Sequence, residues 1–447
     1  MRDSDLLERF GRHLLLTFLV MLAVNQAGSG EPVGRIVDGK PRVSGARIHE
    51  IWTASEIQGA RSTASRQKAL NASAPLIRAS DLVYQGAFKL PHQSIGGSSF
   101  DYGGTGLAFN PVRGSLFIVG HDWGQQVAEV TVPTIRASNG WSDLPTAAVL
   151  QPFTDATEGR MRAVAPDATI TVKVGGLLAY RGALYLSAYI YYDGDGRQSL
   201  SHFVSGQDLA VKGDVVGPYQ VGKLGAGLVS GYFGLVPEEW QEALGGPVLN
   251  GQCCLSIISR TSYGPSAFAI DPSKLGTVTP LPAVPLVYYT GTHQLGQYGA
   301  QSALFNGSTE MGGVVFPKGK RSVLFFGKQG LGPSCYGEGT KEMGLVGTGP
   351  AGDPYCYDPI YPAKGEHAFP YAPYVWAYDA ADLAAVKSGQ RQPWDVKPYA
   401  VWSLELPFPG GPRILGAAYD PQAGRIFLSE AFGDGANPLI HVFGIAN

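Results

Sequence analysis

The chain has 447 residues, of which 44% are hydrophobic and only 16% are charged, and it contains 61 glycines and 32 prolines. This composition favours many short strands joined by tight turns and argues against a long helical bundle. The net charge is -2 and long runs of lysine or arginine are absent, so the sequence lacks the basic surface that nucleic acids require. We therefore expect no nucleic-acid partner.

An export signal is predicted at the N-terminus. Arg9 and Arg12 precede the apolar run LLLTFLVMLAV (Leu14–Val24), and small and polar residues follow it. The run has the length of a signal-peptide core and is too short to span a bilayer. We predict a secretory signal peptide over residues 1–27, and a secreted or periplasmic protein with no transmembrane segment in the mature chain. A retained membrane anchor and a short buried helix are the alternatives.

Residues 28–80 form a second segment, rich in Ser, Ala, Arg and Gly and without sustained periodicity. Such a composition predicts a partly disordered N-terminal extension. Regular alternation of apolar strands and turns begins at Asp81, so we place a single β domain over residues 81–447.

Internal repetition determines the predicted fold. The segments GLAFNPVRGSLFIVG, from Gly106, and GAAYDPQAGRIFLSE, from Gly416, align without a gap. Each copy predicts an apolar strand, an Asn-Pro or Asp-Pro turn that ends in glycine, and a second apolar strand. Third strands follow as VAEVTVP and PLIHVFGI, and weaker copies begin at Gly176, Cys254 and Gly313.

Units of this size cannot bury their own faces, so they must pack against their neighbours. We predict an all-β fold, a β-propeller of about five to seven blades that closes by pairing the two ends of the chain. We assign the strand-like run VPLVYYTG (Val284–Gly291) to a further blade. The segment PEEWQEAL (Pro237–Leu244) predicts a short helix inserted between strands. A β-sandwich or two β domains are the alternative.

Four cysteines in an exported protein predict disulfide bonds. Cys335 and Cys356 lie in one segment rich in Gly and Pro, which leaves the adjacent residues Cys253 and Cys254 as the second pair. Two bridges that join the adjacent cysteines to Cys335 and Cys356 are equally compatible with the spacing.

The adjacent cysteines Cys253-Cys254 resemble the vicinal disulfide of the quinone-cofactor alcohol dehydrogenases, which are propellers. The repeating tryptophan motif of that family is absent here, as are the signatures of the WD40 and sialidase propellers. The resemblance therefore implies the architecture alone. The cofactor stays unknown, and because metal-ligand spacings are missing we predict no metal site.

Candidate site residues come from the loops that follow the second strand of each unit, because equivalent loops of a propeller converge on one face. Histidine, carboxylate and arginine side chains in these loops are the candidates for acid–base chemistry. They are His121, Asp122, Asp193, Arg260, His367 and Glu430. Aromatic neighbours are the candidates for ligand contact, namely Trp123, Tyr192, Tyr263 and Phe432. Ordinary solvated loops are the alternative interpretation.

Three function classes fit these observations. The first is a propeller that binds a polymer, a glycan or a protein through one face without turnover, since recognisable nucleophile motifs are absent. The second is an extracytoplasmic enzyme, a hydrolase, lyase or oxidoreductase, that uses the loop residues named above. The third is a structural component of the cell envelope.

Overall fold

The computed structural model describes residues 71, 73–137, 140–167, 169–350, 352–408 and 410–446. The predicted signal peptide over 1–27 and most of the predicted extension over 28–80 lie outside these residues, so both stay predictions. Among the described helices, none is long and apolar enough to cross a bilayer.

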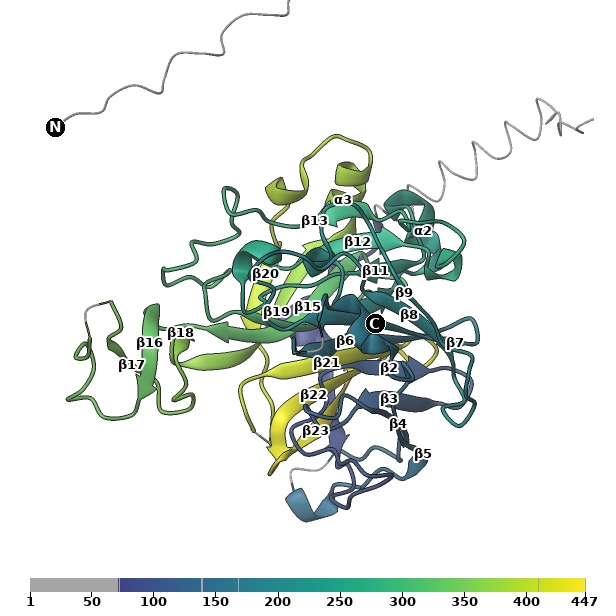
Figure 1. Cartoon of the computed structure of the whole chain (residues 1–447), viewed down its shortest axis with the longest axis horizontal. Helices are drawn as coiled ribbons and strands as arrows, with labels where there is room; N and C mark the ends of the chain where they lie inside the picture. Colours follow the sequence, from purple (N-terminus) through teal and green to yellow (C-terminus); the bar gives the residue numbers. More distant parts are fainter. Residues whose placement is uncertain are drawn as a thin grey trace, which may run out of the picture. The chain divides into compact units, whose positions relative to one another are not determined.

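Five four-stranded antiparallel sheets make up the body of the protein (Figure 1). Blade 1 consists of β2 (Leu107–Asn110), β3 (Ser115–Val119), β4 (Val127–Thr131) and β5 (Val149–Thr154). Blade 2 consists of β6 (Val172–Tyr180), β7 (Ala183–Ile190), β8 (His202–Gly206) and β9 (Val216–Tyr219). Blade 3 consists of β10 (Phe233–Leu235), β11 (Val248–Asn250), β12 (Ala267–Ile270) and β13 (Val284–Val287).

Blades 4 and 5 complete the set. Blade 4 consists of β14 (Glu310–Val315), β15 (Ser322–Gly330), β19 (Tyr371–Asp379) and β20 (Ala400–Ser403). Blade 5 consists of β21 (Ile414–Asp420), β22 (Arg425–Asp434), β23 (Asn437–Ile445) and β1 (Leu82–Phe88). Two α-helices accompany them, α2 (Glu238–Leu244) between β10 and β11 and α3 (Ala380–Lys387) after β19.

The repeat seen in the sequence corresponds to the first hairpins of blades 1 and 5. In blade 1 the amide of Gly114 donates to the Asn110 carbonyl (2.9 Å), and the Asn110 side chain accepts from the amide of Val112 (3.1 Å). The equivalent Asp420 accepts from the amide of Gln422 (2.9 Å). Gly114 has a φ of 61°, which glycine adopts without strain, and this explains why glycine ends the turn.

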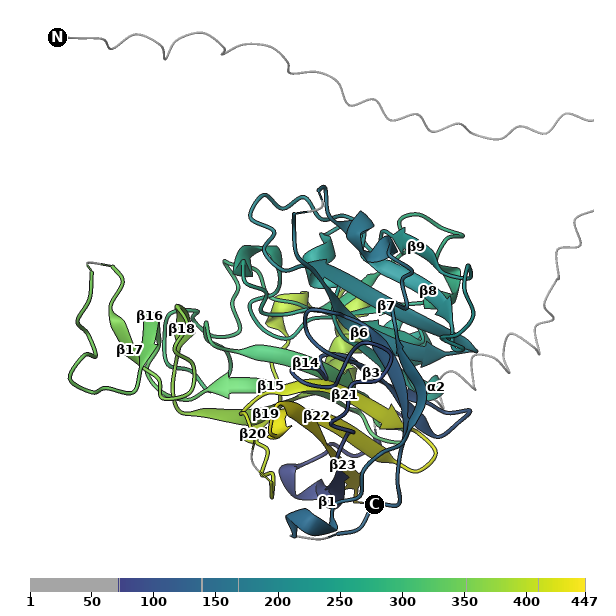
Figure 2. The same cartoon turned by 60° about the horizontal axis from the view of Figure 1, so that its bottom comes forward.

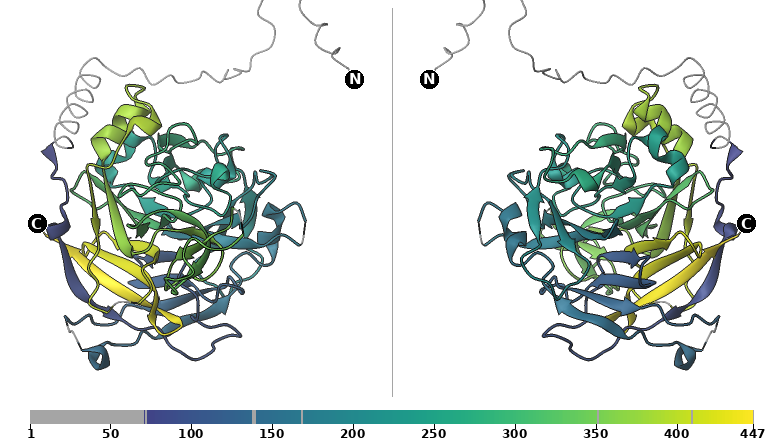
Figure 3. Two further views of the ribbon diagram at one scale, coloured as in Figure 1. Left: turned by 90° about the vertical axis from the view of Figure 1, so that its left-hand side faces the viewer. Right: turned by 90° about the vertical axis from the view of Figure 1, so that its right-hand side faces the viewer.

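The first and last described strands close the ring. β1 pairs antiparallel with β23, from Leu82 opposite Ile445 to Phe88 opposite Ile440. Figure 3 shows β1, in purple, beside the yellow C-terminal strands. The predicted closure by pairing of the two chain ends is therefore confirmed.

Five clusters of buried apolar side chains fill the five interfaces between neighbouring blades. Each cluster contains side chains from both neighbouring blades. Examples are Phe117 and Leu186 between blades 1 and 2, Tyr185 and Phe268 between blades 2 and 3, Leu249 and Phe325 between blades 3 and 4, Leu324 and Leu428 between blades 4 and 5, and Ile440 and Leu116 between blades 5 and 1. Because the last interface joins blade 5 to blade 1, the sheets form a closed five-bladed propeller rather than a sandwich. Five lies at the lower end of the predicted range.

Glycines in the inner strands let the blades meet closely at the axis. A Cβ on Gly175 would lie 1.8 Å from the Ser230 carbonyl oxygen, and one on Gly312 would lie 2.0 Å from that of Ile414. A cavity of about 30 Å³ lined by apolar side chains such as Leu177 remains at the axis, about the share of one water molecule. Ligands must therefore bind on a face of the ring.

Blade 3 differs from its prediction. The hairpin expected from Cys254 onward does not form, because residues 251–266 are a connection between β11 and β12. The first two strands of this blade are β10 and β11, and the predicted helix lies between them as α2. The run VPLVYYTG contains β13, the outermost strand of blade 3, instead of belonging to a further blade.

A long excursion, residues 331–370, interrupts blade 4 between β15 and β19. It contains a three-stranded sheet of β16 (Cys335–Thr340), β17 (Tyr355–Tyr357) and β18 (Gly365–His367). Figures 1 and 2 both show this small sheet standing apart from the five blades.

Candidate functional site

One face of the ring carries the connections between the second and third strands of every blade. We call it the loop face, and it comprises residues 120–126, 191–201, 251–266, 331–370 and 435–436. Because the strands of each blade are antiparallel, the inner strand of each blade also begins on this face. Side chains at the starts of the inner strands therefore lie nearest to the axis.

A group of paired charges lies at this end of the axis. Glu310, the first residue of inner strand β14, accepts from Lys328 Nζ on one oxygen and from Arg413 Nη2 on the other, both at 2.7 Å. Lys328 belongs to β15, and Arg413 immediately precedes β21 of the next blade. We call these three residues the axial cluster, in which one carboxylate holds two cations.

The environment determines the protonation of the cluster. Burial alone would raise the pKa of Glu310, but Arg413 and Lys328 outweigh it and lower the pKa to about 2. Glu310 raises the pKa of Arg413 in return. Burial lowers the pKa of Lys328, and Glu310 opposes that shift. The carboxylate of Glu310 is thus ionised under all ordinary conditions.

Two tyrosines from the excursion side cover Lys328. Its Nζ lies 4.8 Å from the ring centre of Tyr361 and 4.8 Å from that of Tyr371, within cation–π range. The hydroxyl of Tyr371 donates to Asp358 Oδ2 (2.5 Å), which also bonds His367 Nδ1 (2.7 Å). The excursion is in this way fastened over one side of the axial cluster.

A cavity of about 680 Å³, the side cavity, opens on the loop face between blades 1 and 2. Asp122 and Lys173 form an ion pair there (2.7 Å), and Lys173 lies 4.7 Å from the ring centre of Tyr191. Trp123 is 91% exposed. The lining of the side cavity includes Asp122, Trp123, Gln125, Lys173 and Tyr191.

Burial raises the pKa of Tyr189 on β7, and the charges of Asp122 and of Glu310 raise it further while that of Arg413 opposes them.

An exposed row of aromatic rings borders the same region. Tyr102 makes edge contacts with His121 (5.6 Å between ring centres) and with Phe432 (5.9 Å), and His121 makes one with Trp123 (5.9 Å). Tyr102 is 56% and Phe432 41% exposed. The rings come from blades 1 and 5, which are neighbours across the closure of the ring.

Of the residues predicted from the sequence, His121, Asp122, Trp123 and Phe432 thus lie together. The Arg260 side chain contacts the backbone of the blade 2 loop, because its Nε donates to the Asp193 carbonyl (3.1 Å). The Asp193 carboxylate accepts from the amides of Arg197 and Gln198 in its own loop. Residues 191–201 form the connection between β7 and β8 in which Asp193 lies.

The remaining predicted residues differ in exposure. Tyr192 is 66% exposed beside the same connection, whereas Tyr263 packs its ring against Tyr298 and Phe305. Their part in ligand contact stays a prediction.

Two predicted acid–base residues, His367 and Glu430, are buried and engaged in local hydrogen bonds. His367 bonds Asp358 and the Gly337 carbonyl (3.1 Å) within the excursion. Glu430 bonds His441 Nε2 (2.9 Å) and the amide of Gly410 (2.9 Å) within blade 5. Both side chains hold local structure together, and neither opens toward the side cavity.

Sequence reasoning missed Glu310, Arg413, Lys173 and Tyr189. Three of them stand at or just before the start of an inner strand, on the same face as the loops that were considered. The signal was available, because any propeller places inner-strand starts and second-to-third connections together. A search for charges at the start of each first strand would have found Glu310, Arg413 and Lys173.

The structure settles the pairing of the cysteines. Cys253 bonds Cys254 in the connection of blade 3, and Cys335 bonds Cys356 in the excursion. Among the described residues, no group of three or more His, Cys, Asp or Glu side chains is arranged to hold a metal ion.

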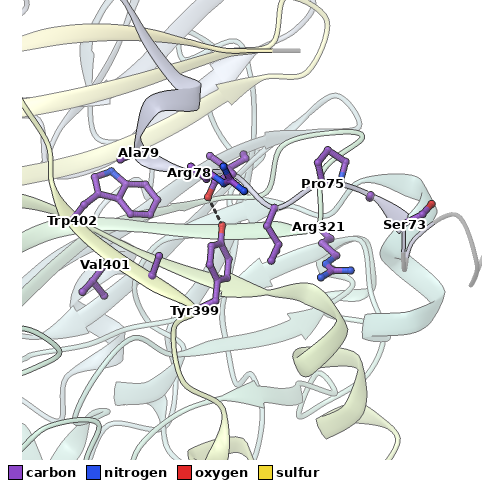
Figure 4. A pocket seen from close by; sticks show the side chains of 12 residues that line it. Ser73, Pro75, Arg78, Ala79, Arg321, Tyr399, Val401 and Trp402 are labelled. Carbon is purple, nitrogen blue, oxygen red and sulfur yellow. Dashed lines mark hydrogen bonds between the residues drawn. The ribbon is translucent and has the colours of Figure 1, made fainter.

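A second cavity, of about 690 Å³, lies at the outer edge of blade 4 (Figure 4). Its walls are residues 73–79 and the edge strand side chains Tyr399, Val401 and Trp402. Tyr399 Oη donates to the Ile77 carbonyl (2.7 Å) and fastens the segment there. Arg321, which also lines this cavity, forms an ion pair with Asp379 (3.2 Å).

The sequence matches no protein-family model and no curated protein. Its structure resembles the GH43 endo-arabinanase from Bacillus licheniformis at 11% identity and a TM-score of 0.38, over 79% of this chain and 95% of that chain. A glycosyl hydrolase from Bacteroides ovatus gives 12% identity and a TM-score of 0.39, over 83% of this chain and 93% of that chain.

A GH130 protein, from work on hydrolases that target β-1,2 mannosidic linkages in Candida mannan, gives 9% identity and a TM-score of 0.39. That likeness covers 84% of this chain and 99% of the other. Scores of this size carry no conclusion about activity. The propeller assignment rests on the sheet order and on the five interfaces described above.

Proposed function

We propose that the protein binds a carbohydrate on the loop face, in the side cavity and along the adjoining aromatic row. The observation that carries this proposal is the side cavity itself, where exposed Trp123 and Tyr191 flank the ion pair of Asp122 and Lys173. Aromatic rings stack on the flat faces of sugars, and paired charges offer both donors and acceptors to hydroxyl groups. The cavity volume lies within the usual range for small-ligand sites.

Binding without turnover is the better supported form of this proposal. A general acid must keep its proton near neutral pH, which requires a raised pKa. The pKa of Glu310 is instead lowered to about 2, and Asp122 is held by Lys173 at 2.7 Å. Glu310 therefore cannot serve as that acid, and Asp122 is engaged in an ion pair with Lys173. Enzymatic turnover is retained as the alternative and is tested by analysing the bound sugar for cleavage products.

We also propose an extracytoplasmic location. All four cysteines are paired in two disulfide bonds, which persist in oxidising compartments and are rare in the cytosol. The signal peptide predicted over residues 1–27 agrees with this location.

The test is a glycan array probed with the full chain and with three variants. Trp123→Ala and Tyr191→Ala should each weaken binding by about tenfold, because each removes a stacking ring. Trp141→Ala is the matched control, an exposed indole (40%) that does not line the side cavity, and should bind like the wild type. Absence of binding to every glycan, or equal binding by Trp123→Ala, would sink the proposal.

A further inference from the structure

We propose that Gln125 is a positioning residue of the carbohydrate site. It fixes the loop of blade 1 that carries Asp122 and Trp123 against inner strand β6 of blade 2, which carries Lys173. This inference rests on the proposed function and adds to it the residue on which the geometry of the side cavity depends.

The amide group of Gln125 joins the two blades. Its Oε1 accepts from the backbone amide of Val174 on β6 (2.6 Å), and its Nε2 donates to the Asp122 carbonyl (2.5 Å). Val174 follows Lys173 directly in the chain, so one side chain connects the backbones on both sides of the ion pair between Asp122 and Lys173. Gln125 is only 6% exposed, and its effect on a bound sugar therefore passes through these neighbours.

The backbone of Gln125 indicates that its side chain is needed at this position. Its φ is 50°, in the left-handed region that glycine adopts without strain and other residues rarely adopt. Glycine would be the favourable residue here if the turn alone mattered. Strained backbone of this kind persists where surrounding contacts hold it, and it clusters at ligand sites. The two bonds of the amide group supply such contacts.

The turn itself is held together by bonds to His121. The backbone amides of Gly124 and Gln125 both donate to the His121 carbonyl (2.9 and 3.0 Å), and the Trp123 amide donates to His121 Nδ1 (3.2 Å). Asp122 and Trp123 stand between the bonded ends of the turn. The anchor at Gln125 therefore determines where these two side chains lie relative to blade 2.

Gln151 provides a matched control at the same interface. It is also a buried glutamine of blade 1 (7% exposed), and it bonds blade 2 through the Gln207 carbonyl (2.8 Å) and the Leu209 amide (2.7 Å). It does not line the side cavity. Loss of either amide group should lower stability, whereas only the loss at Gln125 should alter the site.

The experiment measures affinity and stability on the same proteins. Titration calorimetry and urea unfolding compare the full chain with Gln125→Met and Gln151→Met, in which the side chain keeps its length and loses its amide group. The probes are cello-, manno-, xylo- and arabino-oligosaccharides and any further glycan that binds on the array. Both variants should unfold at lower urea concentrations than the wild type, by similar shifts. Gln125→Met should bind about tenfold more weakly, and Gln151→Met within about twofold of the wild type.

Gln125→Glu makes the anchor depend on pH. Its carboxyl group keeps an acceptor for the Val174 amide, but it donates to the Asp122 carbonyl only when it is protonated. Burial beside Asp122 raises the pKa of a carboxyl group at this position. Relative to the wild type at each pH, binding should be weak at about pH 8 and should recover toward about pH 5, whereas lost packing would not recover. The other titratable and charged groups of the turn and the side cavity, which the wild type shares, are His121, Asp122, Asp155, Arg162 and Lys173.

The outcomes separate the inference from the proposed function. Binding by Gln125→Met within about twofold of the wild type, or equal losses of affinity in the two methionine variants, overturns the inference and leaves the proposed function standing. A relative affinity of Gln125→Glu that does not rise on acidification overturns it as well. Absence of binding by the wild type to every probe overturns both.

Discussion

His202 joins two blades through a buried imidazole. On β8 its Nε2 lies 3.1 Å from Asn250 Oδ1 of blade 3, and its Nδ1 lies 2.8 Å from the hydroxyl of Ser201. Burial lowers the pKa of His202 from 6.5 to about 3, although the bond to Asn250 opposes the shift. A neutral imidazole satisfies both neighbours, with one nitrogen as donor and the other as acceptor. The position is structural rather than part of the ligand site.

His202 should therefore make the protein sensitive to acid. Below pH 6.5 the imidazole of His202 is protonated in the unfolded chain, whereas in the folded protein it is protonated only near pH 3. Stability is lost over that window at about 1.4 kcal/mol per pH unit. Between pH 7 and pH 5, urea unfolding should show the wild type losing about 2 kcal/mol more than His202→Gln. His293→Gln, at an exposed histidine, should behave like the wild type, and equal losses in all three proteins would contradict the assignment.

The excursion between β15 and β19 is the element that shapes the axial cluster. Its strand β16 pairs parallel with β17 and antiparallel with β18, and the bond between Cys335 and Cys356 ties the first two together. A disulfide that closes a segment of this length contributes about 3 kcal/mol to keeping it ordered. Tyr361 lies in this element and contacts Lys328. An ordered excursion therefore helps to hold Lys328 in place.

Removal of this bond should loosen the excursion alone. In Cys335→Ser/Cys356→Ser, amide hydrogen exchange should accelerate over residues 335–367 while the blades exchange as in the wild type, since the five interfaces do not involve these residues. Cys253→Ser/Cys254→Ser is the control, because a bond between sequence neighbours closes no chain segment. Faster exchange throughout the blades, or unchanged exchange over 335–367, would show that this view of the excursion is wrong.

Strand length decided which elements could be predicted from the sequence. The hairpins from Gly106 and Gly416 were predictable because each has two apolar strands of four or more residues directly joined by a turn with side-chain and glycine signals. In blade 3, β10 and β11 have three residues each and are separated by a helix, so neither shows a period.

The site was predictable where it is local in the sequence. Asp122 and Trp123 follow a recognisable strand and could be named from it. Glu310 and Arg413 belong to different blades, and only the ring brings them within 2.7 Å of each other. Pairings of that kind depend on the number and order of blades, which the repeat left between five and seven.

At the scale of the whole molecule, the closed ring separates two faces with different contents. The loop face carries the axial cluster, the side cavity and the exposed aromatic row. The opposite face carries short hairpin turns, at residues 111–114, 181–182, 316–321 and 421–424. The axis between the faces is filled by apolar side chains, so a ligand bound on one face does not contact the other.

Hydrogen exchange of the full chain with and without a glycan selected on the array tests this division most directly. We predict that the glycan slows exchange at residues 120–126, 169–173, 189–192 and 411–414. The four turns of the opposite face should exchange at unchanged rates and serve as the internal control. Protection confined to those turns, or to residues 73–79 and 399–402 around the outer cavity, would contradict the assignment of the loop face as the binding surface.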